Sequence, residues 1–319
     1  MAIRSGRIHL FARSGVRLDA GSVAGVQPNL LARVRQGAYA LESEWGQLYS
    51  EMRLRTLAHA VAARQRDERA TFCRATASAL WRQSVFRTRS DRVDVIVPRR
   101  YTRRDGADVV RHQEPLPEGD VVLIEGLRVT SLDRTVYDVI RTASPEAGIV
   151  VFDDALRKKA WDDRAHTYDE SKAEEFRALV RKRVVAGTGA RGIRQARVLT
   201  ELADGRAQLP GEAVSRFWML QLGVPAPQLQ LRVELGESRF ALLDQAWPEL
   251  GRWMEFDGAI KLTDPEFMSG RSADEVLADQ QEREWLVTRA TGWRCDHYGF
   301  DQLASLDVFA AYLRSIGMR

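Results

Sequence analysis

Two short apolar runs in the last third of the chain predict adjacent strands that carry acidic residues. Asp244 ends the first run, and Glu255 and Asp257 stand in the second, just before Gly258. Side chains two residues apart on a strand point to the same face, so Glu255 and Asp257 are expected to project together. If the two strands pair as a hairpin, Asp244 reaches the same edge. The pattern therefore predicts three carboxylates in one place.

Carboxylates crowded in this way repel one another unless a cation neutralises them. Hard divalent cations such as Mg²⁺ prefer oxygen ligands, so the pattern favours a site for Mg²⁺ or Mn²⁺. Lys261 follows the acids in a chain whose 48 basic residues are nearly all Arg. A lysine is a compact charge with a tunable pKa, which suits a catalytic role beside a metal. The alternative is a surface hairpin with ordinary solvated acids.

The hydrophobic pattern also predicts the other elements of the chain. Apolar positions at helical spacing, with their caps, predict helices at residues 50–66, 71–83, 131–139, 145–160, 168–185, 193–204 and 272–292. Short β-branched runs predict strands at residues 93–97, 109–112, 121–129 and 293–298. The expected fold class is α/β, with a mixed α+β region before the acidic strands.

Residues 29–41 predict a basic helix, a glycine turn and a strand, which is the order of a recognition helix and a β-wing. Arg33 and Arg35 on that helix are candidates for nucleic-acid contact. Glycines interrupt residues 12–28, so we expect a degenerate winged helix over residues 1–45.

Composition excludes several classes of protein. The chain of 319 residues is long enough for two or three cores. It contains no run of about 18 apolar residues, so neither a membrane span nor a membrane partner is expected. The basic N-terminus lacks the apolar core of a signal peptide. Cys73 and Cys295 match no metal spacing and are interpreted as free thiols, so we expect a cytoplasmic protein.

Charge is divided unevenly along the chain. Residues 1–104 hold 20 Arg and 8 acids, a net charge of +12, while the remainder carries −8, which together give +4. The basic footprint expected for DNA binding therefore lies in the N-terminal third. Its densest part is Arg99, Arg100, Arg103 and Arg104 around Tyr101, an aromatic that can stack on a base. Abundant Arg on a solvated turn is the alternative interpretation.

Residues 205–305 resemble the PD-(D/E)XK nuclease superfamily, in particular its very-short-patch-repair-endonuclease-like domain. The resemblance rests on the order and spacing of residues 210–216, 222–225, 227–230, 243–249 and 255–261. It implies a helix, a curved mixed sheet and a second helix, and no organic cofactor. Asp244 and Glu255 match the metal-binding acids, Glu212 matches the acid on the first helix, and Asp257 matches the acid after the central Glu.

The sequence departs from the superfamily signature at one position. Asp257 stands where a Lys would follow the central Glu, and Lys261 is its expected surrogate. Glu212 has a second explanation, since an acid beside Pro210 in the first turn complements the helix dipole. The family's second helix is usually rich in basic residues that face the substrate. Here Arg283 is the candidate for that contact, while Gln280 and Gln281 replace a common Lys.

Residues 127–139 resemble the second half of antitoxins of the abortive-infection type IV toxin–antitoxin systems, as residues 29–41 resemble their winged helix. Asp133, Arg134, Thr135 and Asp138 occupy the family's Arg-Thr-acid pattern, and we interpret them as a structural ion-pair cluster. The expected organisation is a winged helix at 1–45, an antitoxin-like α+β domain at 46–165, a helical linker at 166–204 and an endonuclease-like domain at 205–319.

Two functions from different classes follow from these patterns. The first is a metal-dependent DNA endonuclease whose N-terminal region supplies affinity for DNA. The second is a non-catalytic, antitoxin-like DNA-binding regulator with a toxin partner and an inactive nuclease fold. Intact Asp244, Glu255, Asp257 and Lys261 favour the first function, and the acidic C-terminal half favours the second. The sequence leaves open the DNA structure bound, the choice between DNA and RNA, and the oligomeric state.

Overall fold

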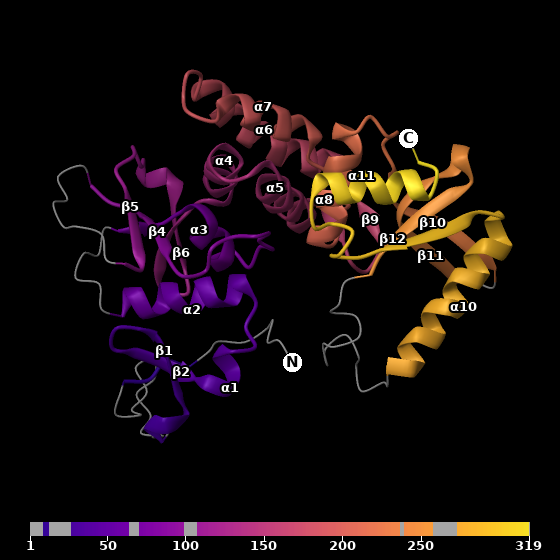
Figure 1. Cartoon of the computed structure of the whole chain (residues 1–319). Coiled ribbons are helices and arrows are strands. Elements are labelled where there is room, and N and C mark those ends of the chain that lie inside the picture. Colours follow the sequence, from indigo (N-terminus) through magenta and orange to yellow (C-terminus); the bar gives the residue numbers. More distant parts are fainter. Residues whose placement is uncertain are drawn as a thin grey trace. The chain divides into compact units, whose positions relative to one another are not determined.

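The computed structural model describes residues 9–12, 27–63, 70–98, 107–236, 239–257 and 273–318. The chain divides into two compact units, each described here by itself. The N-terminal unit comprises Ala2–Val151 and Glu175–Glu201, and the C-terminal unit comprises Phe152–Glu174 and Leu202–Arg319. Both contain helices and sheets, so the α/β class expected from the sequence is confirmed (Figure 1). No helix in the described ranges is long and apolar enough to cross a membrane.

A five-stranded mixed sheet forms the centre of the N-terminal unit. Its strand order is β5-β4-β3-β7-β6. The outer pair β6–β7 and the pair β3–β4 are antiparallel, while β3–β7 and β4–β5 are parallel. The strands are β3 (Thr71–Phe72), β4 (Val93–Ile96), β5 (Val109–His112), β6 (Val121–Ile124) and β7 (Leu127–Thr130).

Helices pack on this sheet and complete the core of the N-terminal unit. Leu57 and Val61 from a helix meet Val95 and Val129 from the sheet in one buried apolar cluster. The helical elements of this part of the chain are η1 (Pro28–Leu30), α1 (Glu42–Trp45), α2 (Ser50–Ala62), α3 (Arg74–Leu80), η2 (Glu118–Asp120) and α4 (Leu132–Thr142).

Two expectations for the N-terminal unit are wrong. The segment that the sequence predicts to be a recognition helix is strand β1 (Leu31–Arg35). It pairs antiparallel with β2 (Ala38–Leu41). Gly37, at a φ of 77°, forms the turn between the two strands. Ala38 and Ala40 of the second strand are buried. The helix expected at 71–83 spans only Arg74–Leu80. It is shorter because Thr71–Phe72 form strand β3 of the central sheet.

Helices α5 (Pro145–Ala160), α6 (Glu170–Ala186) and α7 (Ile193–Leu202) lie close to the ranges that periodicity predicts. The division between the two units falls inside all three of them. A short antiparallel hairpin, β8 (Trp161–Asp162) and β9 (Thr167–Tyr168), separates α5 from α6.

The ion-pair cluster expected around Arg134 is confirmed. The Arg134 guanidinium donates to Asp138 Oδ2 at 2.9 Å and to Asp120 Oδ2 at 3.1 Å. Burial raises the pKa of Asp138, whose side chain is fully enclosed. Burial would also raise the pKa of Asp120, but hydrogen bonds from Arg183 and Arg134 lower it below its ordinary value. The cluster fixes α4 against the turn before β6.

A four-stranded sheet organises the C-terminal unit. Its order is β10-β11-β12-β13, with the first three strands antiparallel and β13 parallel to β12. The elements of this region are α8 (Pro210–Gln221), β10 (Gln228–Gly236), β11 (Arg239–Trp247), η3 (Pro248–Leu250), β12 (Arg252–Phe256), α10 (Ala273–Thr291), β13 (Arg294–Tyr298) and α11 (Leu306–Ser315).

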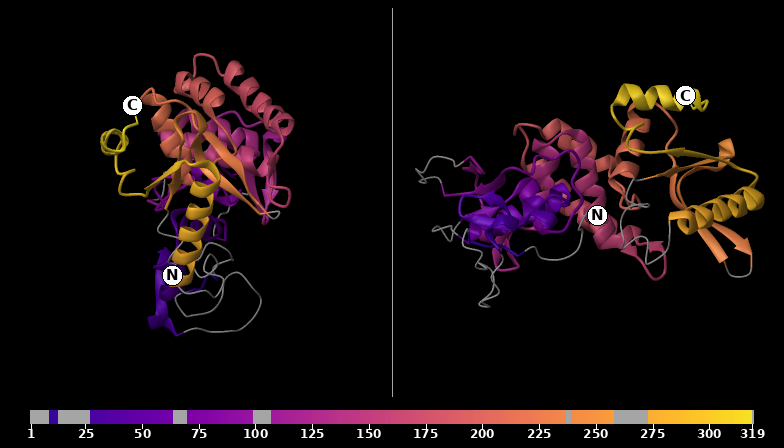
Figure 2. Two further views of the ribbon diagram at one scale, coloured as in Figure 1. Left: turned by 90° about the vertical axis from the view of Figure 1, so that its right-hand side faces the viewer. Right: turned by 60° about the horizontal axis from the view of Figure 1, so that its bottom comes forward.

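Helices cover both faces of this sheet (Figure 2). Val287 of α10 packs with Leu243 and Trp253 on one face. On the other face lie α8 and α11, where Trp218 meets Phe309 with ring centroids 6.0 Å apart. Strand β12 is buried from both sides, which makes any charged side chain on it costly unless it is paired.

Gly211 of α8 lets the helix approach strand β12 closely. A Cβ at this position would lie 2.2 Å from the ring of Phe256, which has no room to withdraw because it is 1% exposed. We expect Gly211→Ala to destabilise the C-terminal unit by about 1–3 kcal/mol, since added volume in a packed core forces strain. Urea denaturation measures the change. The matched control is Gly119→Ala, where a Cβ meets nothing within 4 Å, and an equal loss in both variants would contradict the explanation.

Candidate metal and nucleic-acid site

Asp244 and Glu255 come together where strands β11 and β12 pair. The pairing places Gln245 opposite Met254, so Asp244 and Glu255 occupy the next position along the two strands. Asp244 is partly buried, and its Oδ2 accepts a hydrogen bond from the Phe256 amide at 3.3 Å. Glu255 is only 2% exposed. The hairpin expected from the sequence is confirmed, and it sets two metal-binding candidates side by side.

Arg283 of helix α10 neutralises the buried Glu255. Its Nη1 donates to Glu255 Oε1 at 2.5 Å, and its Nη2 donates to the Leu242 carbonyl at 2.5 Å. Burial alone would lower the pKa of Arg283, but the charges of Glu255 and Asp244 raise it. Both carboxylates therefore act on one guanidinium. Arg283, which the sequence predicts as a contact for nucleic acid, pairs with Glu255 in this structure, and its side chain is 33% exposed.

Asp257 points to the same helix as Glu255, as its spacing predicts. Its Oδ1 accepts from Gln280 at 3.0 Å, one turn of α10 away from Arg283. Its Oδ2 lies 2.8 Å from His297 Nδ1. This hydrogen bond is the main reason why the pKa of His297 is raised to about 11. The structure thus pairs Asp257 with His297 of β13, next to the Asp244–Glu255 pair.

Glu212 holds the start of helix α8. Its side chain is 1% exposed, and Oε2 accepts from the Gln208 amide at 2.8 Å. The expected position of this acid in the first turn of the helix is therefore confirmed. The pKa of Tyr298 on the neighbouring sheet is raised, mainly by burial. A hydrogen bond with Ser215 acts in the opposite direction, and the negative charges of Glu212 and Asp244 raise the pKa further.

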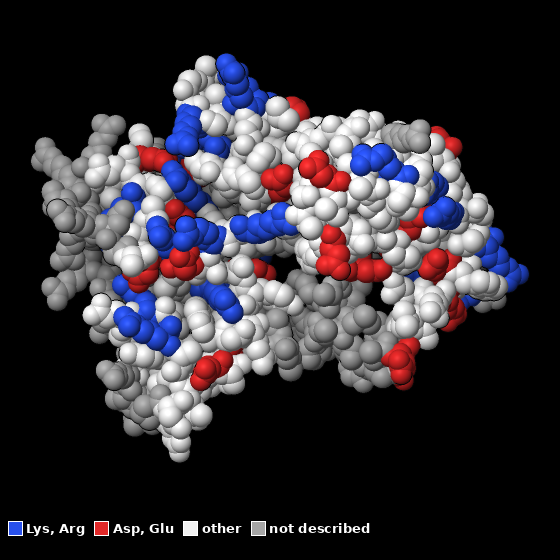
Figure 3. Space-filling view, viewed as in Figure 1, with Lys and Arg blue, Asp and Glu red and all other residues white. Residues whose placement is uncertain are grey.

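Several predicted residues lie outside the described part of the chain, namely Lys261 and the basic group Arg99, Arg100, Arg103 and Arg104. Arg33 is exposed on strand β1. Arg35 forms an ion pair with Asp108, Nε to Oδ2, at 2.9 Å. On the face drawn in Figure 3, basic and acidic side chains lie among one another over the described residues.

One further group of side chains was not predicted. Among the residues that the structure describes, Glu284, Cys295 and His297 form the group of three potential metal ligands whose atoms lie within 4.8 Å of one another. The described acids Glu212, Asp244, Glu255 and Asp257 are not part of such a group in their present conformations. Cys295 and His297 stand two apart on strand β13, a spacing that places both on one face and was the available signal.

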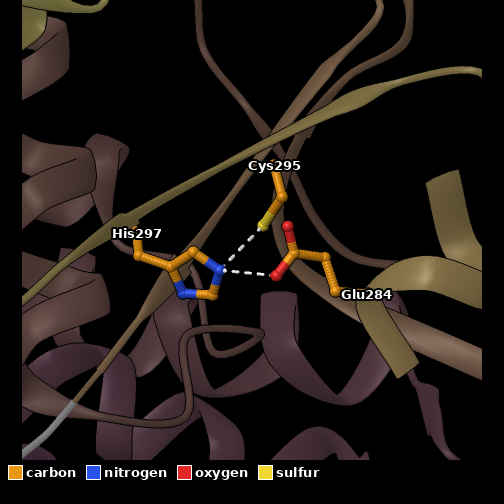
Figure 4. A group of neighbouring side chains, drawn as sticks. All are labelled: Glu284, Cys295 and His297. Atoms are coloured by element: carbon orange, nitrogen blue, oxygen red, sulfur yellow. Dashed lines mark hydrogen bonds and ion pairs between the residues drawn. The ribbon is translucent and has the colours of Figure 1, made fainter. Parts of the chain in front are cut away.

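The three side chains converge from α10 and β13 (Figure 4). His297 Nε2 lies 3.3 Å from Cys295 Sγ and 3.1 Å from Glu284 Oε2. Burial raises the pKa of the Cys295 thiol to about 11, against an opposing hydrogen bond from His297.

The chain is similar to two uncharacterized proteins of Mycobacterium tuberculosis, one from strain CDC 1551 / Oshkosh and one from strain ATCC 25618 / H37Rv. Each is 30% identical over 117 residues, which are 37% of this chain and 40% of the relative. The chain therefore aligns with less than half the length of these relatives. No protein-family model matches it, and no solved structure matches it significantly.

Proposed function

We propose that the protein is a metal-dependent endonuclease that hydrolyses phosphodiester bonds in DNA. The observation that carries the proposal is the pairing of Asp244 with the buried Glu255 on adjacent strands. A buried carboxylate on a strand covered from both sides is costly. Its retention beside a second acid is explained if the pair binds a divalent cation.

The order of elements supports this proposal. Helix α8 precedes three antiparallel strands, and α10 then leads to the parallel strand β13. A helix, a mixed sheet and a second helix are the arrangement that the resemblance to PD-(D/E)XK nucleases leads one to expect. The acids lie on the central strands β11 and β12, where that family carries its metal ligands.

The donor set fits a hard cation, because Asp244 and Glu255 supply carboxylate oxygens. A bound Mg²⁺ or Mn²⁺ would supply a water of lowered pKa and neutralise charge on the phosphate. In the present arrangement Arg283 pairs with Glu255. Once released from Glu255, its planar guanidinium suits bidentate binding of a phosphate. Lys261 remains the proposed group for orienting the water or stabilising the pentavalent phosphorus.

A cleavage assay of the full chain tests the proposal. Purified protein should cut DNA in Mg²⁺ or Mn²⁺ and lose activity in EDTA, and Asp244→Asn should lose the metal-dependent activity. The substrates should include duplex, nicked, mismatched and branched DNA, with RNA for comparison. The matched control is Glu249→Gln, an exposed acid in η3, which should cut normally. Cleavage by Asp244→Asn at the wild-type rate would overturn the assignment.

One observation favours the second function. Arg283 already supplies an internal cation to Glu255, and an inactive nuclease fold would neutralise a remaining acid in this way. The protein would then be a DNA-binding, antitoxin-like regulator with a toxin partner. Salt-dependent DNA binding without cleavage of any substrate, in the presence of Mg²⁺ and Mn²⁺, would support that function over the nuclease.

A further inference from the structure

We propose that Glu284, Cys295 and His297 form a binding site for Zn²⁺, separate from the Asp244–Glu255 pair. The three side chains come from two elements that are distant in sequence, with Glu284 on α10 and the other two on β13. Each supplies one atom that zinc accepts: a carboxylate oxygen, a thiolate sulfur and an imidazole nitrogen. The site does not depend on the proposed nuclease activity.

The spacing of the ligand atoms fits a tetrahedral ion. Zinc bonds of about 2.3 Å to sulfur and about 2.0–2.1 Å to nitrogen or oxygen place sulfur and nitrogen about 3.5 Å apart, and nitrogen and oxygen about 3.3 Å apart. The observed distances from His297 Nε2 are 3.3 Å to Cys295 Sγ and 3.1 Å to Glu284 Oε2. These two distances lie within a few tenths of an ångström of the tetrahedral values, and Cys295 Sγ lies within 4.8 Å of the ligand oxygen of Glu284.

A second observation, the hydrogen bond on the far side of the His297 ring, also points to a metal. His297 uses Nε2 toward the cluster and Nδ1 toward Asp257 Oδ2, at 2.8 Å. A carboxylate on the far nitrogen fixes the tautomer and ring orientation of a metal-binding histidine and raises its basicity. Asp257 is itself held by Gln280 at 3.0 Å. Asp257 is thus a positioning residue for His297.

The mixture of ligands selects the class of cation. Thiolate and imidazole suit zinc, whereas magnesium prefers oxygen alone. The side chains of His297 and Glu284 are 33% and 39% exposed, so the site is open to solvent and a water can complete four-coordination. The ion would join α10 to β13 and so hold the helix that carries Arg283 against the strand next to Glu255.

Zinc titration of the full-length protein tests the inference. Protein stripped with EDTA under reducing conditions is titrated with Zn²⁺ against a chromophoric chelator, and with Co²⁺ to detect the charge-transfer absorption of a cobalt–thiolate bond. We expect one site per chain and a thiolate band in the wild type. Cys295→Ser and His297→Ala should lose the site, and Asp257→Asn should weaken binding by about 10–100-fold.

Matched variants separate this site from other causes. Glu282→Gln changes an exposed acid on the same helix, and Asp244→Asn changes the other proposed metal site, so both should bind zinc as the wild type does. The wild type alone can overturn the inference. It does so if it binds no zinc, or if it binds Co²⁺ without a cobalt–thiolate absorption band. Unchanged binding in Cys295→Ser would overturn it equally. DNA cleavage plays no part in these readouts, so failure here is distinguishable from failure of the nuclease proposal.

Discussion

Glu255→Gln is expected to reduce Mg²⁺-dependent DNA cleavage to about one hundredth of the wild-type rate or less, because a neutral amide replaces the buried charge that we propose to hold the cation. The side chain keeps its size, and its amide oxygen still accepts from Arg283. The fold should therefore persist, which circular dichroism and a thermal melt will show. The rate is measured on whichever DNA structure the wild-type protein cuts.

The control for this prediction lies on the same sheet. Glu234→Gln removes an acid whose side chain is 65% exposed and pairs with the half-exposed Arg232, so cleavage should continue at the wild-type rate. If Glu255→Gln is folded and cuts as fast as the wild type, Glu255 holds no catalytic metal.

Arg134→Met is expected to destabilise the N-terminal unit by about 3–5 kcal/mol, the usual cost of breaking a buried ion pair from one side. The substitution removes the cation that lies 2.9 Å from Asp138, whose carboxylate is fully enclosed. The remaining cation near Asp138 is Arg141, at 3.9 Å. Urea denaturation measures the loss as a shift in the transition of the N-terminal unit.

Two further variants test whether the loss in Arg134→Met comes from the buried ion pair. Arg89→Met removes a partner of Asp91 at a site where both side chains are more than half exposed, and it should change stability by less than about 1 kcal/mol. Adding Asp138→Leu to Arg134→Met should restore much of the lost stability, because the enclosed Asp138 carboxylate is then no longer left without its cation. Equal effects of Arg134→Met and Arg89→Met would contradict the structural role of the cluster.

Local rules predicted the parts of the fold where sequence neighbours decide the outcome. The period of two in Glu255 and Asp257 predicted that both project to one side, and both meet α10. The resemblance of Asp133, Arg134, Thr135 and Asp138 to an antitoxin pattern led us to expect an ion-pair cluster, and Arg134 pairs with Asp138 at 2.9 Å. The spacing of apolar residues also predicted the helix at Pro145–Ala160.

Errors arose where tertiary pairing overrides local preference. Leu31–Arg35 has the composition of a basic helix, but pairing with Ala38–Leu41 across the Gly37 turn makes it a strand. Thr71–Phe72 leave the predicted helix because β4 and β7 flank them as sheet partners. The sheet partners of β3 lie tens of positions away, which a periodicity argument does not see, whereas β1 and β2 form a local hairpin.

Contacts between distant elements account for the missed residues. The ion pair of Arg283 with Glu255 spans 28 positions, and nothing in the pattern of α10 distinguishes Arg283 from a solvated arginine. Cys295 was interpreted as a free thiol, although His297 stands two positions further along the same strand. Their shared strand face became informative only once α10 placed Glu284 beside them.

Mn²⁺ binding to zinc-loaded protein tests the central claim, that Asp244 and Glu255 hold a divalent cation. Calorimetric titrations of wild type and Asp244→Asn are compared, each alone and with a short DNA duplex, because substrate completes some metal sites. Prior loading with zinc keeps Glu284, Cys295 and His297 from contributing. We predict one Mn²⁺ site in the wild type that Asp244→Asn removes. No binding by the wild type with or without DNA, or equal binding by both proteins, would contradict the account.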